Sequence, residues 1–303
     1  MLSRPGLPSF DYVRAGSHDE VVRLLVTGGP DVRLLMGGTD LLVRMRDGVV
    51  RARTLVDVKH LPGMRTIAYD SAAGLTVGAA VTMNQLASNA DVRAHYAILA
   101  EAASAVASYQ VRNRATLGGN LCNASPAADT APAVMVLGGR LVLCGPEGER
   151  EVPIDEFFLG PGKSARQANE FLTAVRLPPP RQGARGTYLK LGRNREGDLA
   201  VVGVGVLGSP SSEVPPGYAF SIALASVAPV PLRATAAERL LAGQKPGGAA
   251  FAAAAQLAAQ EARPIDDVRS GVAYRRAMVE SLTRRGLETV WRGLSAASSG
   301  RGR

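Results

Sequence analysis

A triplet of prolines at positions 178–180 is the feature that most constrains the fold of this chain. Proline lacks a backbone N–H and disfavours helix at the residue before it, so three in a row end any preceding strand or helix. Before the triplet, strand-like and helix-like segments are mixed, whereas after it strands come first and helices follow. This order predicts two α+β domains rather than one parallel βαβ sheet.

The elements follow from hydrophobic periodicity and from turn residues. Expected strands cover residues 32–36, 54–58, 66–69, 75–79, 140–144, 149–152, 171–177, 186–191, 199–207 and 218–227. Expected helices cover 41–48, a broken region from 82 to 111, a segment starting at 129, and 233–242, 249–262 and 271–294. Thr82 and Gln85 have the spacing of a capping box.

We predict an N-terminal domain at 1–178, divided into subdomains of about 1–60 and 61–178. A smaller C-terminal α+β domain is expected at 181–295, with a three-stranded antiparallel sheet plus helices, and a disordered tail at 296–303.

Composition excludes several classes of protein. The two cysteines, Cys122 and Cys144, cannot build a disulfide scaffold or a four-cysteine cluster, and the three histidines are isolated, so no metal site is predicted. The net charge is +9, but the basic residues are scattered arginines without a localised patch, so no nucleic acid partner is expected. Without a long apolar run or a signal-peptide pattern, the sequence predicts a cytoplasmic protein with no membrane span.

Two stretches resemble nucleotide-binding motifs but lack the neighbouring residues that these motifs require. Gly203-Val-Gly-Val-Leu-Gly208 has dinucleotide-fingerprint spacing, but a proline-rich loop follows where the motif requires a helix. We interpret these glycines as allowing a strand to pack closely. Gly162-Lys-Ser164 resembles the end of a P-loop, but Phe157 stands where the first glycine is required.

Two other loops indicate a bound ligand. Leu35-Met-Gly-Gly-Thr-Asp-Leu41 follows a strand, and Thr116-Leu-Gly-Gly-Asn120 opens a second loop that runs to Ala128. Each has paired glycines, where a backbone can approach a ligand closely, followed by short polar side chains. Consecutive N–H groups in such turns form anion-binding concavities. The residues leave open whether these are two ordinary turns or a pyrophosphate site.

At these loops the chain resembles the FAD-binding medium subunit of the molybdenum hydroxylases, the xanthine dehydrogenase and aerobic carbon monoxide dehydrogenase family. The resemblance extends from about residue 8 to 292. It includes the stretches Gln110–Asn120, Phe157–Lys163, Glu170–Pro178, Tyr188–Arg193, Gly197–Val202, Ser226–Arg233 and Ser270–Arg276. One departure is the stretch Ser164–Asn169, which is more polar than the usual family segment.

The resemblance implies an FAD held between two subdomains of the vanillyl-alcohol-oxidase (PCMH) type, followed by the smaller C-terminal domain. The implied cofactor-binding residues are Leu35, Met36, Gly37, Gly38, Thr39, Asp40, Leu41, Thr116, Leu117, Gly118, Gly119, Asn120, Asn123, Asp129, Leu172 and Lys190. Backbone groups of Gly37, Gly38, Thr39, Thr116, Gly118 and Gly119 would hold the pyrophosphate. Asn120 and Asn123 would follow the phosphate–ribityl chain, Asp129 would accept from cofactor hydroxyls, and Leu172 would lie near the flavin.

Lys190 has a role that the residues themselves also support. It is one of only four lysines in an arginine-rich chain, and it lies between two leucines of an expected strand. A positive charge at the isoalloxazine edge stabilises an anionic reduced flavin and tunes its potential. Without the resemblance, an edge-strand lysine whose charged end reaches solvent is the simpler interpretation.

The family pattern also implies partners. A large subunit would carry a molybdopterin-type molybdenum cofactor and a small one two 2Fe–2S iron–sulfur clusters, in a dimer of heterotrimers. This chain would take electrons from those clusters and pass them to an external acceptor. The complex could bring it to the inner face of the membrane. Two alternatives stay open: a free-standing FAD oxidoreductase of the same fold with its own substrate, and a non-catalytic module whose glycines only form turns.

Overall fold

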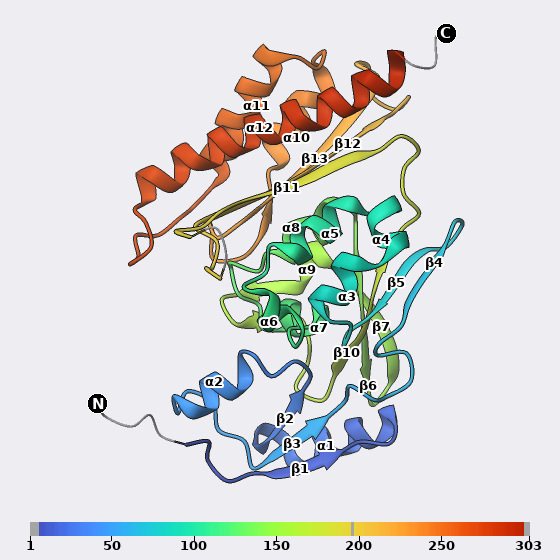
Figure 1. The fold of residues 1–303 in the computed structure, drawn as a ribbon, viewed down its shortest axis with the longest axis vertical. Helices are drawn as coiled ribbons and strands as arrows, with labels where there is room; N and C mark the ends of the chain where they lie inside the picture. Colours follow the sequence, from blue (N-terminus) through green and yellow to red (C-terminus); the bar gives the residue numbers. More distant parts are fainter. Residues whose placement is uncertain (1–5, 195–196, 300–303) are drawn as a thin grey trace.

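The N-terminal end of the chain forms a small parallel sheet. The computed structural model describes residues 6–194 and 197–299. Strands β1 (Asp11–Arg14), β2 (Val32–Leu35) and β3 (Thr54–Asp57) pair in the order β1-β3-β2. Helix α1 (His18–Gly28) and a 3-10 turn (Gly29–Asp31) connect β1 to β2, and α2 (Leu41–Arg46) connects β2 to β3 (Figure 1). Because helical crossovers join the strands, this sheet is parallel. The sequence pattern did not predict a parallel sheet in this α+β domain.

The second unit contains a five-stranded antiparallel sheet. Its order is β4-β5-β10-β6-β7, from β4 (Ile67–Asp70), β5 (Gly74–Gly78), β6 (Arg140–Gly145), β7 (Gly148–Pro153) and β10 (Phe171–Leu177). Between β5 and β6 lie α3 (Met83–Ser88), α4 (Ala90–His95), α5 (Ala97–Ser104), α6 (Tyr109–Arg112), α7 (Leu117–Cys122) and α8 (Thr130–Val136). After β7 come α9 (Ile154–Phe157) and a small hairpin of β8 (Phe158–Gly160) and β9 (Lys163–Ser164). The predicted capping box at Thr82 and Gln85 is present.

The third unit is a sheet covered on both faces. Strands β11 (Arg185–Leu191), β12 (Val202–Pro210), β13 (Tyr218–Ala225) and β14 (Leu232–Arg233) are antiparallel in chain order. Helices α10 (Thr235–Gly243), α11 (Gly248–Glu261) and α12 (Val272–Ser299) lie on one side, and α5 and α8 of the second unit contact the other (Figure 1). The two-residue strand β14 extends the predicted three-stranded sheet to four strands.

The valine–glycine alternation of β12 matches this double burial. Val202, Val204 and Val206 belong to the core under the C-terminal helices. On the other face, a Cβ at Gly203 would lie 2.5 Å from the Tyr188 hydroxyl, and one at Gly205 would lie 3.1 Å from Pro132 Cβ. The glycines therefore permit close packing of the strand, as interpreted from the sequence.

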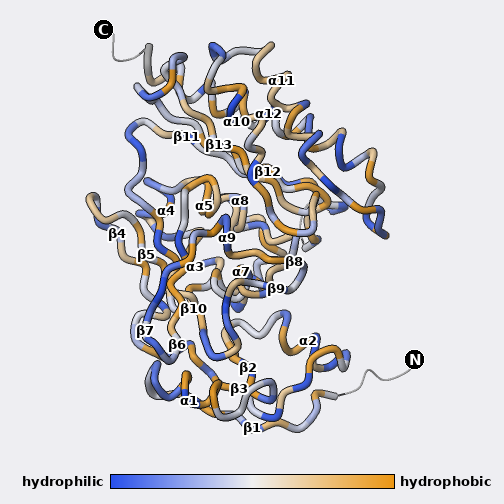
Figure 2. The backbone as a smooth tube through the Cα atoms, turned by 180° about the vertical axis from the view of Figure 1, so that it is seen from behind, coloured by the Kyte–Doolittle hydropathy of each residue, from blue (hydrophilic) through white to orange (hydrophobic). Residues whose placement is uncertain are grey.

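Most of the buried apolar residues fall into two large cores. One draws almost all of its residues from Ala15 to Tyr188, and the other runs from Val201 to Leu294. Apolar and polar stretches alternate closely along the backbone (Figure 2). Helix α12 continues through the first four residues of the predicted tail, and residues 300–303 lie outside the described part of the chain. No helix in the described residues has the length and hydropathy needed to cross a membrane.

The polar stretch Ser164–Asn169 lies beside a charged cluster at the start of β10. Glu170 accepts from Arg150 Nε at 2.6 Å and Nη2 at 2.8 Å, and from the Gln167 N–H at 2.7 Å. Arg166 Nη1 donates to the Glu170 carbonyl at 2.7 Å. The Arg166 side chain and the Gln167 backbone of this segment therefore have partners inside the fold.

This cluster predicts an acid-sensitive contribution to stability. The Arg150 hydrogen bonds lower the pKa of Glu170, so the stabilisation is fully present above the ordinary pKa and is lost as the pH falls through the lowered pKa of the folded state. We expect Arg150→Met to reduce the free energy of unfolding by about 1–3 kcal/mol at neutral pH and by less at an acid pH below the ordinary pKa of Glu170. Denaturant unfolding at both pH values measures this, with Arg284→Met, an exposed ion pair, as the control. An equal loss at both pH values would contradict the assignment.

Candidate FAD site

The first glycine loop lies at the carboxyl end of the parallel sheet. It starts as β2 ends at Leu35, and α2 begins at Leu41. Gly38 has a φ of 75°, a left-handed conformation that glycine adopts without strain. Across residues 6–194 and 197–299, no protein atom accepts a hydrogen bond from the N–H groups of Gly37, Gly38, Thr39 or Asp40. Four successive unpaired donors make this loop suitable for an anion.

The second glycine loop is partly helical, because α7 begins inside it. Thr116 caps this helix, and its hydroxyl accepts from the Gly119 N–H at 3.0 Å. The Leu117 N–H donates to the Val81 carbonyl at 3.0 Å and the Gly118 N–H to the Ala79 carbonyl at 2.9 Å. The backbone donors of Gly118 and Gly119 are therefore already used within the protein, unlike those of the first loop.

The fold brings the two loops into direct contact. A Cβ at Gly37 would lie 2.2 Å from the Arg114 carbonyl oxygen, closer than two such atoms can approach. Asn123 Nδ2 donates to Asp40 Oδ1 at 3.2 Å, and the Thr116 hydroxyl lies 3.8 Å from Met36 Sδ. Gly37 thus makes room for the residues that lead into the second loop, whereas its place in the sequence indicated only room for a ligand. Gly118 makes room for a different segment, the residue after β5, since its Cβ would lie 2.7 Å from the Ala79 carbonyl oxygen.

A buried ionic cluster joins the second loop to the C-terminal sheet. Lys190 Nζ on β11 lies 2.8 Å from Asp129 Oδ2, at the start of α8, and donates to the Ala105 carbonyl at 2.8 Å. The Tyr188 hydroxyl donates to Asp129 Oδ1 at 2.7 Å. The Lys190 side chain is 15% exposed and that of Asp129 is 6% exposed. Lys190 therefore points inward to a carboxylate. This excludes the simpler interpretation, in which its charged end reaches solvent.

Burial dominates the electrostatics of this cluster. It raises the pKa of Asp129, against the opposing effects of Lys190 and Tyr188. It also raises the pKa of Tyr188 far above the ordinary value, so the phenol stays protonated and acts as a donor. The Asp129 carboxylate is thus held by one cationic and one neutral donor.

The other predicted residues are distributed around these contacts. Asn120 Oδ1 accepts from the Thr130 hydroxyl at 2.6 Å, which links α7 to α8. Leu117 and Leu172 are almost fully buried, and Leu35 and Leu41 are half-buried. Leu172 lies in the core behind the second loop. The next residue, Thr173, accepts from the Ala79 N–H at 2.9 Å through its carbonyl, and the Ala79 carbonyl in turn accepts from Gly118 of that loop.

Sequence reasoning missed Tyr188 and Thr130 as parts of this site. Tyr188 had a detectable signal, because residues two apart in a strand share a face and Lys190 lies two positions later. Thr130 had none, since its partner Asn120 is ten residues away across a turn.

Metal ligands are not grouped in the described ranges. No set of three His, Cys, Asp or Glu side chains there could hold a metal ion. Cys122 and Cys144 are free thiols, and burial raises the pKa of Cys122 to about 11, which disfavours its thiolate.

Comparisons with known proteins agree with this geometry. Residues 8–180 match the FAD-binding domain in molybdopterin dehydrogenase, and residues 187–290 match the CO dehydrogenase flavoprotein C-terminal domain. The chain is 34% identical to the carbon monoxide dehydrogenase medium chain of Hydrogenophaga pseudoflava, over 94% of this chain and 98% of that one. It is 30% identical to the xanthine dehydrogenase FAD-binding subunit of Escherichia coli, over 90% and 93% of the two chains.

A solved structure gives the same relationship. The carbon monoxide dehydrogenase of Hydrogenophaga pseudoflava that lacks the Mo-pyranopterin moiety of its cofactor superposes with a TM-score of 0.89, at 35% identity, over 94% of this chain and 98% of that one. The matches cover both domains and the two glycine loops. The chain therefore belongs to the family of FAD-binding medium subunits of the molybdenum hydroxylases, and it is an FAD-dependent oxidoreductase subunit.

Proposed function

We propose that this chain is the FAD-carrying electron-transfer subunit of a three-subunit molybdenum hydroxylase. Its partners would be a large subunit with a molybdopterin-type cofactor and a small subunit with two 2Fe–2S clusters, assembled in the cytoplasm as a dimer of heterotrimers. The chain would receive electrons from the small subunit and pass them to an external acceptor. Bound FAD supplies the redox chemistry, and this chain's residues hold it and set its electrostatic surroundings.

The observation that carries the proposal is the row of N–H groups in the first loop that have no acceptor in the described part of the chain. A pyrophosphate is an anion that needs several donors, and Gly37, Gly38, Thr39 and Asp40 provide four adjacent ones. We assign the pyrophosphate mainly to this loop. In the second loop Gly118 and Gly119 already donate within the protein, so any contact from them to the phosphates would share those bonds.

The remaining assignments use side chains. Asn120 and Asn123 would contact the phosphate–ribityl chain from the second loop, with Asn123 also fixing Asp40. Asp129 and Lys190 would act as a pair near the flavin ring, because neither side chain is independent of the other. Thr116, Leu117 and Leu172 would support the loop from within the core.

Cofactor analysis of the native complex tests this function. Purification with partners should yield about one FAD per chain together with molybdenum and iron. Flavin reduction by an organic substrate should require the partners. A colourless complex that releases no FAD on denaturation would refute the proposal, and substrate-driven reduction of the isolated chain would favour the free-standing oxidoreductase.

We expect Gly119→Val to abolish FAD retention. A Cβ at this position would lie 2.8 Å from the Thr116 hydroxyl, so a β-branched side chain would displace the cap of α7 and cover the surface of the second loop. Loss of the cap alone costs about 1 kcal/mol. The flavin-to-protein absorbance ratio of the purified variant is the measurement. Stoichiometric FAD in this variant would contradict the assignment of the second loop.

A further inference from the structure

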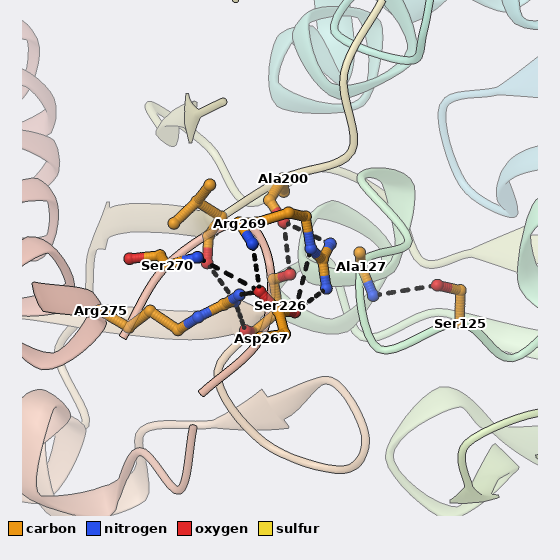
Figure 3. A network of polar contacts seen from close by, with 9 residues as sticks. Ser125, Ala127, Ala200, Ser226, Asp267, Arg269, Ser270 and Arg275 are labelled. Atoms are coloured by element: carbon orange, nitrogen blue, oxygen red, sulfur yellow. Dashed lines mark hydrogen bonds and ion pairs between the residues drawn. The ribbon is translucent and has the colours of Figure 1, made fainter. Parts of the chain in front are cut away.

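Two C-terminal stretches, around Ser226 and Ser270–Arg276, take no part in the flavin site described above. The structure brings them together beside the segment 123–128, which connects Asn123 to Asp129. Figure 3 shows the network that they form with Ala200 and, beside it, the separate hydrogen bond from the Ala127 N–H to the Ser125 hydroxyl. Its interactions extend from the loop before α12 to the second glycine loop.

Arg275 lies at the centre of this network. It is 1% exposed, and its Nη1 donates to the carbonyls of Val201 at 2.9 Å and Ser226 at 2.8 Å. Its Nη2 donates to Asp267 Oδ1 at 2.7 Å. A buried guanidinium needs such a carboxylate and such acceptors, because an unpaired buried charge is strongly destabilising.

Asp267 is itself held from several directions. Arg269 contacts Asp267 Oδ2 through Nη2 at 2.6 Å and through Nε at 3.0 Å, and its backbone N–H donates to Oδ1 at 2.8 Å. Arg269 Nη1 also donates to the Ala200 carbonyl at 3.2 Å. The carboxylate therefore fixes both arginines on the carbonyls that precede β12.

Ser226 links this network to the second loop by hydrogen bonds. It has a φ of 68°, an uncommon conformation for a residue other than glycine, and its hydroxyl donates to the Ala200 carbonyl at 2.6 Å. In this conformation its N–H donates to the Pro126 carbonyl at 2.7 Å. Pro126 lies midway between Asn123 and Asp129, so this bond joins the C-terminal domain to the segment that connects the two residues.

We propose that Asp267, Arg275 and Ser226 form an interdomain clamp that positions the segment 123–128 for FAD binding. They are positioning residues, since they act on this segment through the hydrogen bond from Ser226 to Pro126. The proposal rests on the proposed FAD function. Locally, the clamp holds Pro126 through a left-handed Ser226, and a buried arginine keeps Ser226 in place. Backbone mobility of the segment can therefore be measured separately from FAD binding.

Arg275→Met is the main test variant, measured in the full chain after FAD removal and in the complex. Without FAD, amide hydrogen exchange in residues 124–130 should become about tenfold faster, because the clamp no longer holds Ser226. In the complex, FAD affinity should fall about tenfold and the visible circular dichroism of the flavin should change. Arg284→Met is the matched control, as an exposed arginine on the same helix, and should change none of these.

Two further variants separate positioning from general stability. Val279→Ala removes core volume from the same helix and should lower stability without selective exchange in residues 124–130. Ser226→Gly keeps the N–H and suits the left-handed conformation, so it should retain FAD, whereas Ser226→Val should behave like Arg275→Met. Ser226→Val also covers the case in which Arg275→Met fails to fold.

The outcomes distinguish the two proposals. If Arg275→Met and Ser226→Val change exchange in residues 124–130 no more than Val279→Ala does, the clamp is refuted. If the unmodified chain binds no FAD, the proposed function fails, and the exchange measurement still decides whether the clamp exists.

Discussion

Gly37→Ala should release FAD while the C-terminal domain stays folded. The added Cβ would lie 2.2 Å from the Arg114 carbonyl oxygen, 2.9 Å from its carbon and 3.0 Å from the Ala115 Cα. All three are backbone atoms, so no side-chain rotation relieves the overlap, and the two loops must separate. Overpacking of this kind costs up to about 3 kcal/mol, which corresponds to roughly a 100-fold loss of affinity if it falls on the FAD-binding conformation.

Gly160→Ala provides the control for Gly37→Ala. Gly160 lies in the same domain, has no atom within 4 Å of its Cβ position and does not have a positive φ. Titration of the FAD-free variants with FAD, followed by flavin fluorescence, gives the two affinities. Equal affinity in the two variants would mean that contact between the loops does not form the binding site.

Lys190→Met should retain FAD but lower both its redox potential and the stability of the chain. The substitution leaves the buried Asp129 carboxylate with the Tyr188 hydroxyl as its only donor among the described residues. Breaking a buried ion pair in this way costs about 3–5 kcal/mol. Loss of the positive charge disfavours a reduced anionic flavin, and about 1.4 kcal/mol of differential stabilisation corresponds to roughly 30 mV for a two-electron couple.

The pH dependence of this variant has a definite sign. Without Lys190 the pKa of Asp129 should rise further, because burial already raises it and the compensating cation is gone. A group with a raised acid pKa destabilises the fold when it is ionised, so the stability loss should be largest at high pH. It should shrink as the pH falls through the pKa of Asp129, which thermal unfolding at several pH values would measure.

Two control variants separate charge from stability. Lys59→Met removes a similarly buried partner of Asp57, at 2.7 Å, in the first subdomain, so it should lower stability without moving the potential. The double variant Lys190→Met with Asp129→Asn removes both charges. If the net charge of the pair tunes the flavin, its potential should return toward the unmodified value. A Lys190→Met potential equal to that of the unmodified protein would remove Lys190 from this role.

The fold could be predicted well where local signals were strong. The capping box at Thr82, the hairpin of β6 and β7 and the long C-terminal helix follow from turn residues and periodicity. The parallel pairing of β1, β3 and β2 did not, because short strands of four residues give no indication of their partners. Two-residue β14 was missed because it is too short to show periodicity.

The sequence by itself determined the two glycine loops, their polar residues and the order of the elements, because turn chemistry and hydrophobic period are local properties. Only the tertiary structure decided what each glycine is for. Gly37 admits the other loop, while the first loop keeps its N–H groups free. The tertiary structure also paired Lys190 with Asp129, 61 positions away, and Ser226 with Pro126. Such contacts depend on how whole sheets and helices pack, and no local pattern encodes the partner.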